Sequence, residues 1–560
     1  MQDFVSPIDD ILWTLNAGAG AQRLKDWDAA LAQEVVQQAA RFIDAEIAPL
    51  DRIAESQPPQ LRAGRVILAA PFVSAYQKYA AEGWPGICTP EAYGGQALPH
   101  VLGCVVSELL SGSCLGFQTV LSLGQGATRT LLAHGSEEQR SRVIPRLNSG
   151  EWLATMCLTE PTAGSDLSQI RTTASPADDG SWRIEGTKIF ISGGDQNLTS
   201  NIMHLVLART PEAPPGIRGL ALFLCPAELP DGERNSMSVL RLEEKMGLHA
   251  SPTCQMTFEG ARAEMLGGPG EGLARMFTMM NATRLDVATE GVGLAQVAAQ
   301  RSWAYAVERR QGRSAESDES VDLICSHADV QRMLMTQRAL VLGIRALVYR
   351  TMVTLELGDN APLIEFLTPV CKAYATEAAV ECANLAIQIH GGYGYCREYR
   401  VEQILRDARI TCIYEGTNGI QAMTLAGRLL KMHDGACAEA FATDIENECA
   451  TAQENGQNSM ARELQVLLDG WRVSTELVRQ CKDPGLCARD YLQLTGLIAL
   501  AATWSRLERA ASEHPSPNQT LATAKFVRER ILPQATTLEQ VIRNAATGSS
   551  LTSDYFTGMH

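Results

Sequence analysis

Glu415 is the residue of this chain best placed for acid–base chemistry. It follows the apolar Ile413 and Tyr414 and precedes the flexible Gly416, at the end of a charged run that begins at Arg406. Burial beside apolar groups raises the pKa of a carboxylate and makes it a usable base near neutral pH. A Tyr-Glu-Gly tripeptide alone is also typical of a surface glutamate at a helix end, so the accompanying stretches decide the interpretation.

Three other stretches carry residue types that suit an anion or a flavin. Residues 156–166 have the sequence Met-Cys-Leu-Thr-Glu-Pro-Thr-Ala-Gly-Ser-Asp, a loop rich in hydroxyl groups, and residues 188–194 have Lys-Ile-Phe-Ile-Ser-Gly-Gly, a strand that ends in a tight turn. Residues 388–395 have Gln-Ile-His-Gly-Gly-Tyr-Gly-Tyr, where paired glycines allow close approach of a pyrophosphate. This last stretch lacks the G-x-G-x-x-G spacing of a dinucleotide-binding fold, and we interpret His390 as structural rather than catalytic.

Composition narrows the class of protein. The 560 residues are 45% hydrophobic and 20% charged, which is ordinary for globular proteins, and the net charge of −16 argues against nucleic acid as the main partner. The 15 cysteines form no C-x-x-C pair, so neither a metal site of the zinc type nor a disulfide framework is indicated. The first ten residues lack a signal pattern, and the most apolar run, 494–504, is too short to span a bilayer. We therefore expect a cytoplasmic protein without an integral membrane segment.

Hydrophobic periodicity predicts a mainly α-helical protein with a central antiparallel β domain. We expect an N-terminal extension at 1–26, a helical domain at 27–154, a β domain at 155–271, a helical bundle with the base at 272–431, and an additional helical domain at 432–560. The predicted helices are 29–47, 72–82, 101–114, 121–134, 136–144, 288–309, 328–355, 364–389, 461–480, 488–510 and 522–542, the last kinked at Pro533; the predicted strands are 182–192, 204–208, 219–224, 237–242 and 253–258.

The motifs, in this order and between helical segments, resemble the acyl-CoA dehydrogenase family over about residues 29–430. The specific matches are Leu-Thr-Glu-Pro-x-Ala-Gly-Ser-Asp, Gln-Ile-His-Gly-Gly-x-Gly-Tyr and Arg-Asp-Ala-Arg-Ile-x-x-Ile-Tyr-Glu-Gly-Thr. The N-terminal Phe4–Trp13 and the extra C-terminal helices resemble the longer bacterial branch, which includes 3-methylmercaptopropionyl-CoA dehydrogenases. The resemblance implies a helical N-domain, a β-barrel middle domain and a helical bundle, followed by a C-terminal helical extension.

The resemblance also implies an activity. Family enzymes remove the α proton of an acyl-CoA and pass the β hydrogen to FAD, with an electron-transfer flavoprotein as the usual acceptor. Glu415 matches the catalytic base, whereas Thr283 occupies the alternative base position on an earlier helix and is no plausible base. The extra C-terminal segment would cover surface used for tetramer contacts in smaller relatives, so we expect a homodimer.

By the same resemblance, the remaining site residues divide between cofactor and substrate. The loop at 156–166, the strand at 188–194 and Thr417, two residues after the base, would contact the flavin ring and the pyrophosphate of FAD. Arg309 and the Gly-Gly loop at 388–395 would contact the FAD of the neighbouring subunit. The substrate contacts would lie beside the thioester and the CoA chain. The predicted cofactor residues are Met156, Leu158, Thr159, Ser165, Phe190, Ile191, Ser192, Arg309, Gln388, His390, Gly391, Gly392 and Thr417; the predicted substrate residues are Ser165, Arg284, Tyr414 and Gly416.

The chain departs from the family pattern at four positions. Gly312 stands where a phenylalanine packs near the adenine, and Gly419 stands where a glutamine contacts FAD. Asn281 replaces an aspartate beside the arginine, and Thr162 replaces a common glycine. The departures put adenine packing and some substrate contacts in doubt.

Three alternatives to a dehydrogenase remain at the level of the sequence. A flavin-dependent acyl-CoA oxidase of the same fold differs only in how oxygen reaches the flavin. A flavin-containing nucleic-acid-binding relative would need a basic surface and usually lacks a working base, which the net charge and Glu415 oppose. A purely structural helical protein would bind no flavin. The acyl chain length is open, because no residue in the sequence determines it.

Overall fold

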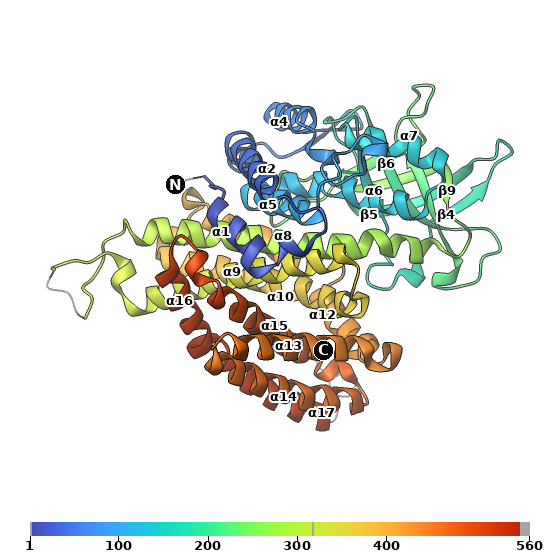
Figure 1. The fold of residues 1–560 in the computed structure, drawn as a ribbon. Coiled ribbons are helices and arrows are strands. Elements are labelled where there is room, and N and C mark those ends of the chain that lie inside the picture. Colours follow the sequence, from blue (N-terminus) through green and yellow to red (C-terminus); the bar gives the residue numbers. More distant parts are fainter. Residues whose placement is uncertain (1–2, 316–318, 549–560) are drawn as a thin grey trace, which may run out of the picture. The chain divides into compact units, whose positions relative to one another are not determined.

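The structure, a computed structural model, describes residues 3–315 and 319–548, which divide into two compact units. One unit contains residues 3–6 and Val35–Asp286, and the other contains Pro7–Glu34 and residues 287–548. Helix α2 (Ala29–Phe42) and helix α8 (Gly272–Ala306) run across the divisions in the sequence. We call the units the β-containing unit and the helical unit, and Figure 1 labels many of their elements.

The β-containing unit begins with helices. They are α3 (Leu50–Ser56), α4 (Ala70–Ala81), α5 (His100–Leu121), α6 (Leu123–His134) and α7 (Glu137–Asn148). Helix α5 is long and apolar enough to cross a membrane by length and composition, but almost all of it is buried inside the protein. It extends seven residues beyond the predicted end because the irregular backbone at Cys114 only kinks it.

The central sheet closes on itself through the pairing of β6 with β7, which confirms the predicted barrel. Its strands are β3 (Trp152–Cys157), β4 (Thr173–Pro176), β5 (Trp182–Ser192), β6 (Asn201–Arg209), β7 (Leu220–Pro226), β8 (Met237–Leu242) and β9 (Thr253–Leu266). Most neighbours are antiparallel, as expected, but β3 pairs with β6 in parallel. The apolar faces of β6 and β7 share a core with α6, α7 and the first turns of α8.

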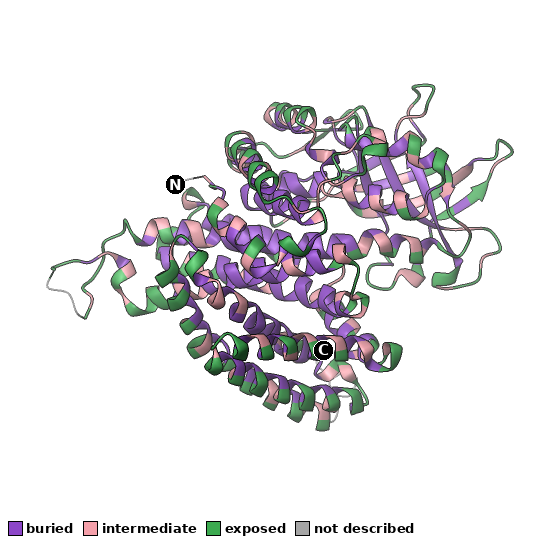
Figure 2. Ribbon diagram, viewed as in Figure 1, coloured by how far each residue is buried: buried purple, intermediate pink, exposed green. Residues whose placement is uncertain are grey.

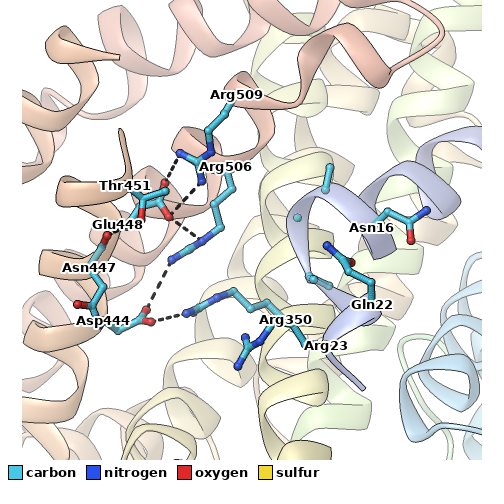
Figure 3. A pocket seen from close by; sticks show the side chains of 14 residues that line it. Asn16, Gln22, Arg23, Arg350, Asp444, Asn447, Glu448, Thr451, Arg506 and Arg509 are labelled. Carbon is cyan, nitrogen blue, oxygen red and sulfur yellow. Dashed lines mark hydrogen bonds and ion pairs between the residues drawn. The ribbon is translucent and has the colours of Figure 1, made fainter. Parts of the chain in front are cut away.

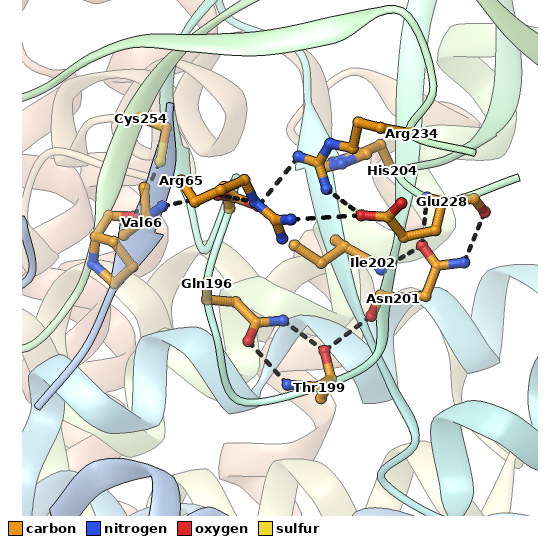
Figure 4. Close-up of polar contacts among 12 residues, drawn as sticks. Arg65, Val66, Gln196, Thr199, Asn201, Ile202, His204, Glu228, Arg234 and Cys254 are labelled. Carbon is orange, nitrogen blue, oxygen red and sulfur yellow. Dashed lines mark hydrogen bonds and ion pairs between the residues drawn. The ribbon is translucent and has the colours of Figure 1, made fainter. Parts of the chain in front are cut away.

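A buried carboxylate fixes the turn that follows β5. The side chain of Asp195 is fully buried and accepts hydrogen bonds from the backbone of Val66 at 2.8 Å and from the guanidinium groups of Arg65 at 3.0 Å and Arg234 at 3.1 Å. Figure 4 labels these three donor residues. Val66 and Arg65 belong to a small hairpin of β1 (Gln60–Arg62) and β2 (Arg65–Ile67). Charge-assisted hydrogen bonds of this kind are about twice as strong as neutral ones. Three donors to one carboxylate therefore fix the position of the turn.

The helical unit is built from long helices, and its core lies along α15. They are α9 (Ala328–Leu357), α10 (Ala361–His390), α11 (Val401–Thr411), α12 (Asn418–Met423), α13 (Ala436–Glu454), α14 (Asn458–Gln480), α15 (Ala488–Arg509), α16 (Pro517–Phe526) and α17 (Gln534–Thr547), with α1 (Ile8–Trp13) near the start of the chain. Figure 2 shows α15 buried along most of its length while α14 and α17 expose their outer faces.

The helix boundaries correct several predictions. The helical region expected from residue 272 starts with one long helix, α8, which includes most of the predicted 288–309, and α13 is a helix for which the sequence analysis gave no range. The predicted helix 522–542 is present as α16, a π-helical stretch at Val527–Ile531 and α17, and Leu532 and Pro533 keep helical backbone angles between the last two. Proline lacks the N–H that a regular α-helix needs, so the hydrogen-bond pattern changes beside Pro533 while the backbone stays helical.

Candidate functional site

The loop that follows β3 is fixed to β5 by a buried ion pair. The Lys188 ammonium lies 2.8 Å from the Glu160 carboxylate and donates to the Leu158 carbonyl at 3.0 Å; the side chains of Lys188 and Glu160 are 0% and 4% exposed. The same carboxylate accepts the backbone N–H groups of residues 171 and 172. Burial alone would raise the pKa of Glu160, but the Lys188 charge and these hydrogen bonds outweigh it and lower the pKa.

This anchoring leaves the polar side of the loop exposed. Glu160 and Ala163 close a tight turn through two backbone hydrogen bonds of 3.0 Å, while Thr162 and Ser165 face outward and Thr159 is half-buried. Leu158 is buried in the core, so only its backbone is available to a ligand. The loop therefore presents hydroxyl and amide groups from a rigid frame.

Phe190 lies beside this loop in a strained conformation. The register of β5 against β9 shifts between Lys188 and Ile191, and within this irregularity Phe190 has φ of 59° and a side chain that is 60% exposed. The backbone N–H of Ile189 donates to the Thr159 carbonyl at 2.9 Å, which holds the strand against the loop. A phenylalanine with positive φ is rare, and such strain collects at ligand sites. Ile191 points into the core, and Ser192 is half-buried.

Arg284 and Thr283 lie on α8 within the β-containing unit. The Arg284 guanidinium donates to Asn281 at 3.2 Å and lies 6.0 Å from the Phe277 ring centre. Asn281, one of the departures from the family pattern, therefore accepts this hydrogen bond from the arginine with an uncharged amide oxygen. The Thr283 hydroxyl donates to the carbonyl of Met280 in its own helix at 3.0 Å.

In the helical unit, Glu415 occupies a turn between α11 and α12. Its φ of 56° is positive, and Gly416 follows with φ of 84°. The side chain of Gln421 donates to the carbonyls of both residues at 3.2 and 3.3 Å. The Thr417 hydroxyl caps α12 by accepting a hydrogen bond from the N–H of Ile420 at 3.2 Å. The cap occupies one acceptor position of this hydroxyl, which we predicted to contact FAD.

Tyr414 ties this turn to the long helix α8. Its hydroxyl donates to the carboxylate of Glu290, which is buried on α8. Burial raises the pKa of Tyr414, and the Glu290 charge raises it further, so the phenol stays protonated. The sequence analysis missed Glu290, since no local pattern links it to a residue so far along the chain.

A second cluster in the helical unit surrounds the end of α10. His390 is buried, stacks on Tyr305 at a ring distance of 4.2 Å, and binds the Ala386 carbonyl at 2.8 Å. Burial lowers its pKa, which keeps it neutral, as a structural role requires. Its side chain is thus not exposed to a ligand.

The surface beside His390 is open and carries a cation. Gly391 has φ of 61°, and a Cβ on either Gly391 or Gly392 would meet nothing within 4 Å among the described residues. Arg309 is exposed, 5.7 Å from the ring of Tyr393, and Gln388 is exposed as well. The structure brings these predicted residues together as a glycine shelf with a guanidinium group beside it.

Comparison with known proteins places these features in context. Residues 30–151, 155–261 and 270–430 match the models of the acyl-CoA dehydrogenase N-terminal, middle and C-terminal domains, and residues 441–550 match the model "acetyl-CoA dehydrogenase C-terminal like". The chain is 41% identical to 3-methylmercaptopropionyl-CoA dehydrogenase of Ruegeria pomeroyi, over 74% of this chain and 73% of that protein.

Two solved structures extend the likeness to the fold of almost the whole chain. Caenorhabditis elegans ACDH-11 in complex with C11-CoA has a TM-score of 0.78 at 21% identity, covering 98% of this chain and 96% of that one. An acyl-CoA dehydrogenase complexed with FAD from Bacillus anthracis has a TM-score of 0.76 at 21% identity, covering 94% and 90%. The helical segment after residue 432 is therefore included in a shared architecture.

Proposed function

Because the chain belongs to the acyl-CoA dehydrogenase family, we propose that it oxidises the Cα–Cβ bond of an acyl-CoA thioester to a trans-2-enoyl-CoA, with Glu415 as the base. One observation carries the assignment of the base: Glu415 is held in a strained left-handed turn by Gln421 and by the Tyr414–Glu290 hydrogen bond. Strain at a carboxylate in a rigid frame is typical of a functional residue.

FAD is the family's cofactor, and when bound it supplies the acceptor for the β hydrogen as hydride. The residues present fit such a group. Phe190 offers an exposed flat ring beside a loop of hydroxyl and amide groups, and the Gly391–Gly392 shelf leaves room for a phosphate next to the Arg309 guanidinium. Arginine is the preferred partner of phosphate because its fork matches two oxygens and it is always charged.

The other residues would position the substrate. The Glu415 carboxylate takes the α proton, and its own backbone N–H donates to the thioester oxygen, where negative charge develops. Arg284 interacts with the CoA chain, and Tyr414, Gly416 and Ser165 lie along the thioester. Substrate binding would exclude water around Glu415, raise its pKa and strengthen it as a base.

The test is the variant Glu415→Gln with the exposed Glu398→Gln as a control. The first should keep FAD but lose dehydrogenation by a factor of about 10²–10⁴, because one positioned base supplies that much. The second should behave as wild type. Normal bleaching of the flavin by substrate in Glu415→Gln would refute the assignment.

For the acyl group, we propose a short, thioether-containing chain. The support is the 41% identity to a dehydrogenase named for 3-methylmercaptopropionyl-CoA. A panel of butyryl, isobutyryl, methylmercaptopropionyl and palmitoyl thioesters, compared by kcat/KM, would test this, and a preference for the palmitoyl thioester would contradict it.

We propose an electron-transfer flavoprotein as the acceptor, a cytoplasmic location and a homodimer. An oxidase is the competing activity, and the two differ in how the reduced protein is reoxidised. Anaerobic bleaching followed by addition of an electron-transfer flavoprotein or of air separates them: recovery at turnover speed in air alone would identify an oxidase. Light scattering that gives the mass of a tetramer would contradict the dimer.

A further inference from the structure

A polar cavity of about 270 Å³ lies within the helical unit, and its lining includes none of the residues assigned above. It is lined by the segment from Asn16 to Arg23 and by residues of helices α9, α13 and α15 (Figure 3). Gly18 allows this segment to lie flat on α9 and α15, since a Cβ there would come within 2.7 Å of the Ala346 side chain. The cavity thus forms where the start of the chain meets the additional C-terminal helices.

The lining carries an excess of positive charge. It contains four arginines and two carboxylates: Arg23, Arg350, Arg506, Arg509, Asp444 and Glu448. Figure 3 shows the guanidinium groups on α9 and α15 arranged around the two carboxylates of α13, with the side chains of Asn16 and Gln22 across the opening.

The two carboxylates are shared among three guanidinium groups. Glu448 lies 2.9 Å from both Arg506 and Arg509, whereas Asp444 binds Arg350 and lies 4.0 Å from Arg506. Three guanidinium groups offer about fifteen N–H donors, while two carboxylates offer about eight acceptor positions. Burial lowers the pKa of Arg506 to about 10, and the neighbouring charge of Arg350 acts in the same direction.

Arg23 adds a fourth cation at the rim. Its side chain is 49% exposed and its partner is Asp359 at 3.6 Å, which is itself 56% exposed. Exposed ion pairs of this kind contribute little. Arg23 can therefore turn toward a ligand without breaking a strong contact.

We propose that this cavity binds a small oxyanion that carries at least two negative charges, of the phosphate or polycarboxylate class. The described residues that line it include no aromatic ring, and the groups that they offer are mainly guanidinium, carboxylate and amide groups that suit oxygen atoms. The volume suits a group with several oxygens, and guanidinium groups bind such oxygens in pairs. Binding would join the N-terminal segment to α13 and α15 and stabilise the helical unit.

The experiment is calorimetric titration of the full-length FAD-loaded protein with sodium pyrophosphate and, separately, with sodium citrate, at constant ionic strength. Wild type should bind at least one of the two anions saturably, and the anion that binds more tightly identifies the class of ligand. Arg23→Ala should weaken it at least fivefold, and Arg23→Glu should abolish it. The matched control is Arg472→Ala, which removes an exposed arginine paired with Glu446 on the same unit.

Two outcomes would overturn the proposal. One is the absence of saturable binding of both anions to wild type. The other is unchanged affinity in Arg23→Ala and Arg23→Glu, which would place the anion at the phosphate-binding surface for FAD or CoA instead. Both variants alter a half-exposed side chain, so melting curves of the anion-free proteins should match wild type and exclude a folding defect.

Discussion

The hydroxyl of Tyr414 donates a hydrogen bond to the carboxylate of Glu290, a residue 124 positions earlier in the chain. The bond links the turn that carries Glu415 to the middle of α8. Because the tyrosine directly precedes the proposed base, its position limits how far the Glu415 backbone can move.

Tyr414→Phe should therefore lower kcat by about tenfold and lower stability by about 1–2 kcal/mol. The loss of one hydrogen bond to a buried carboxylate costs about this much. Steady-state kinetics and urea denaturation measure the two effects. Tyr395→Phe, at a side chain 85% exposed, is the control and should change neither. Unaltered kinetics in Tyr414→Phe would show that the hydrogen bond does not position the base.

Lys188→Met should destabilise the protein by about 3–5 kcal/mol and reduce the flavin content after purification. The change leaves the Glu160 carboxylate buried without its cation, and breaking a buried pair at one partner costs about this much. Denaturation curves and flavin absorbance measure the effects. The double variant Lys188→Met/Glu160→Gln should recover part of the stability, and Arg183→Met, on an exposed part of the same strand, should cost less than about 1 kcal/mol. If Lys188→Met is as stable as wild type, the ion pair does not hold the loop.

Arg309→Ala should weaken FAD retention by about tenfold or more, with little change in melting temperature of the FAD-free protein. The guanidinium group is exposed beside the glycine shelf, so its removal costs a ligand contact rather than a core contact. Equilibrium dialysis of FAD measures the affinity. Arg397→Ala, another exposed arginine near the end of α10, serves as the control. An Arg309→Ala protein that keeps its full FAD affinity would rule out this contact.

Acid sensitivity should depend on Asp10. Its carboxylate binds Arg338 at 2.8 Å and His514 at 2.9 Å. Burial alone would raise the pKa of Asp10, but the bonds from His514 and Arg338 outweigh it and hold the pKa well below 3.8. A carboxylate with a lower pKa in the folded state stabilises the fold at neutral pH, and this contribution disappears as pH falls below about 4.

Asp10→Asn should accordingly lose about 2 kcal/mol at pH 7 and show a smaller difference from wild type at pH 3. Unfolding free energies measured by urea denaturation from pH 7 to pH 3 provide the test. A constant difference across this range would mean that the ion pairs of Asp10 do not contribute.

Much of the fold could be predicted from periodicity because most elements have one consistent pattern. Strands β5 and β8 agree with the predicted ranges, and α9, α10, α14 and α15 lie within a few residues of them. Helical structure was expected from residue 272, but no local pattern indicated that residues 272–287 belong to the same unbroken helix as the predicted 288–309. The parallel pairing of β3 with β6 also has no local signal, since it depends on how the barrel closes.

The candidate site was predicted by residue type but not by its supporting contacts. Glu415 and Phe190 stand in recognisable motifs, whereas Glu290 pairs with a distant tyrosine and the four arginines of the cavity come from three segments far apart in the sequence. Those contacts arise only when the helices pack, so no spacing along one segment reveals them. His390 agrees with its predicted structural role, because burial and stacking on Tyr305 follow from its place at the end of an apolar helix.

The left-handed backbone at Glu415 and Phe190 lowers the stability of the fold at two residues that the proposed activity needs. A side chain at such an angle costs about 1 kcal/mol, which glycine would relieve. Libraries selected for heat resistance alone should therefore accumulate glycine at both positions and yield robust, inactive proteins. A screen for more thermostable variants of this protein must therefore measure product formation at the same time as stability.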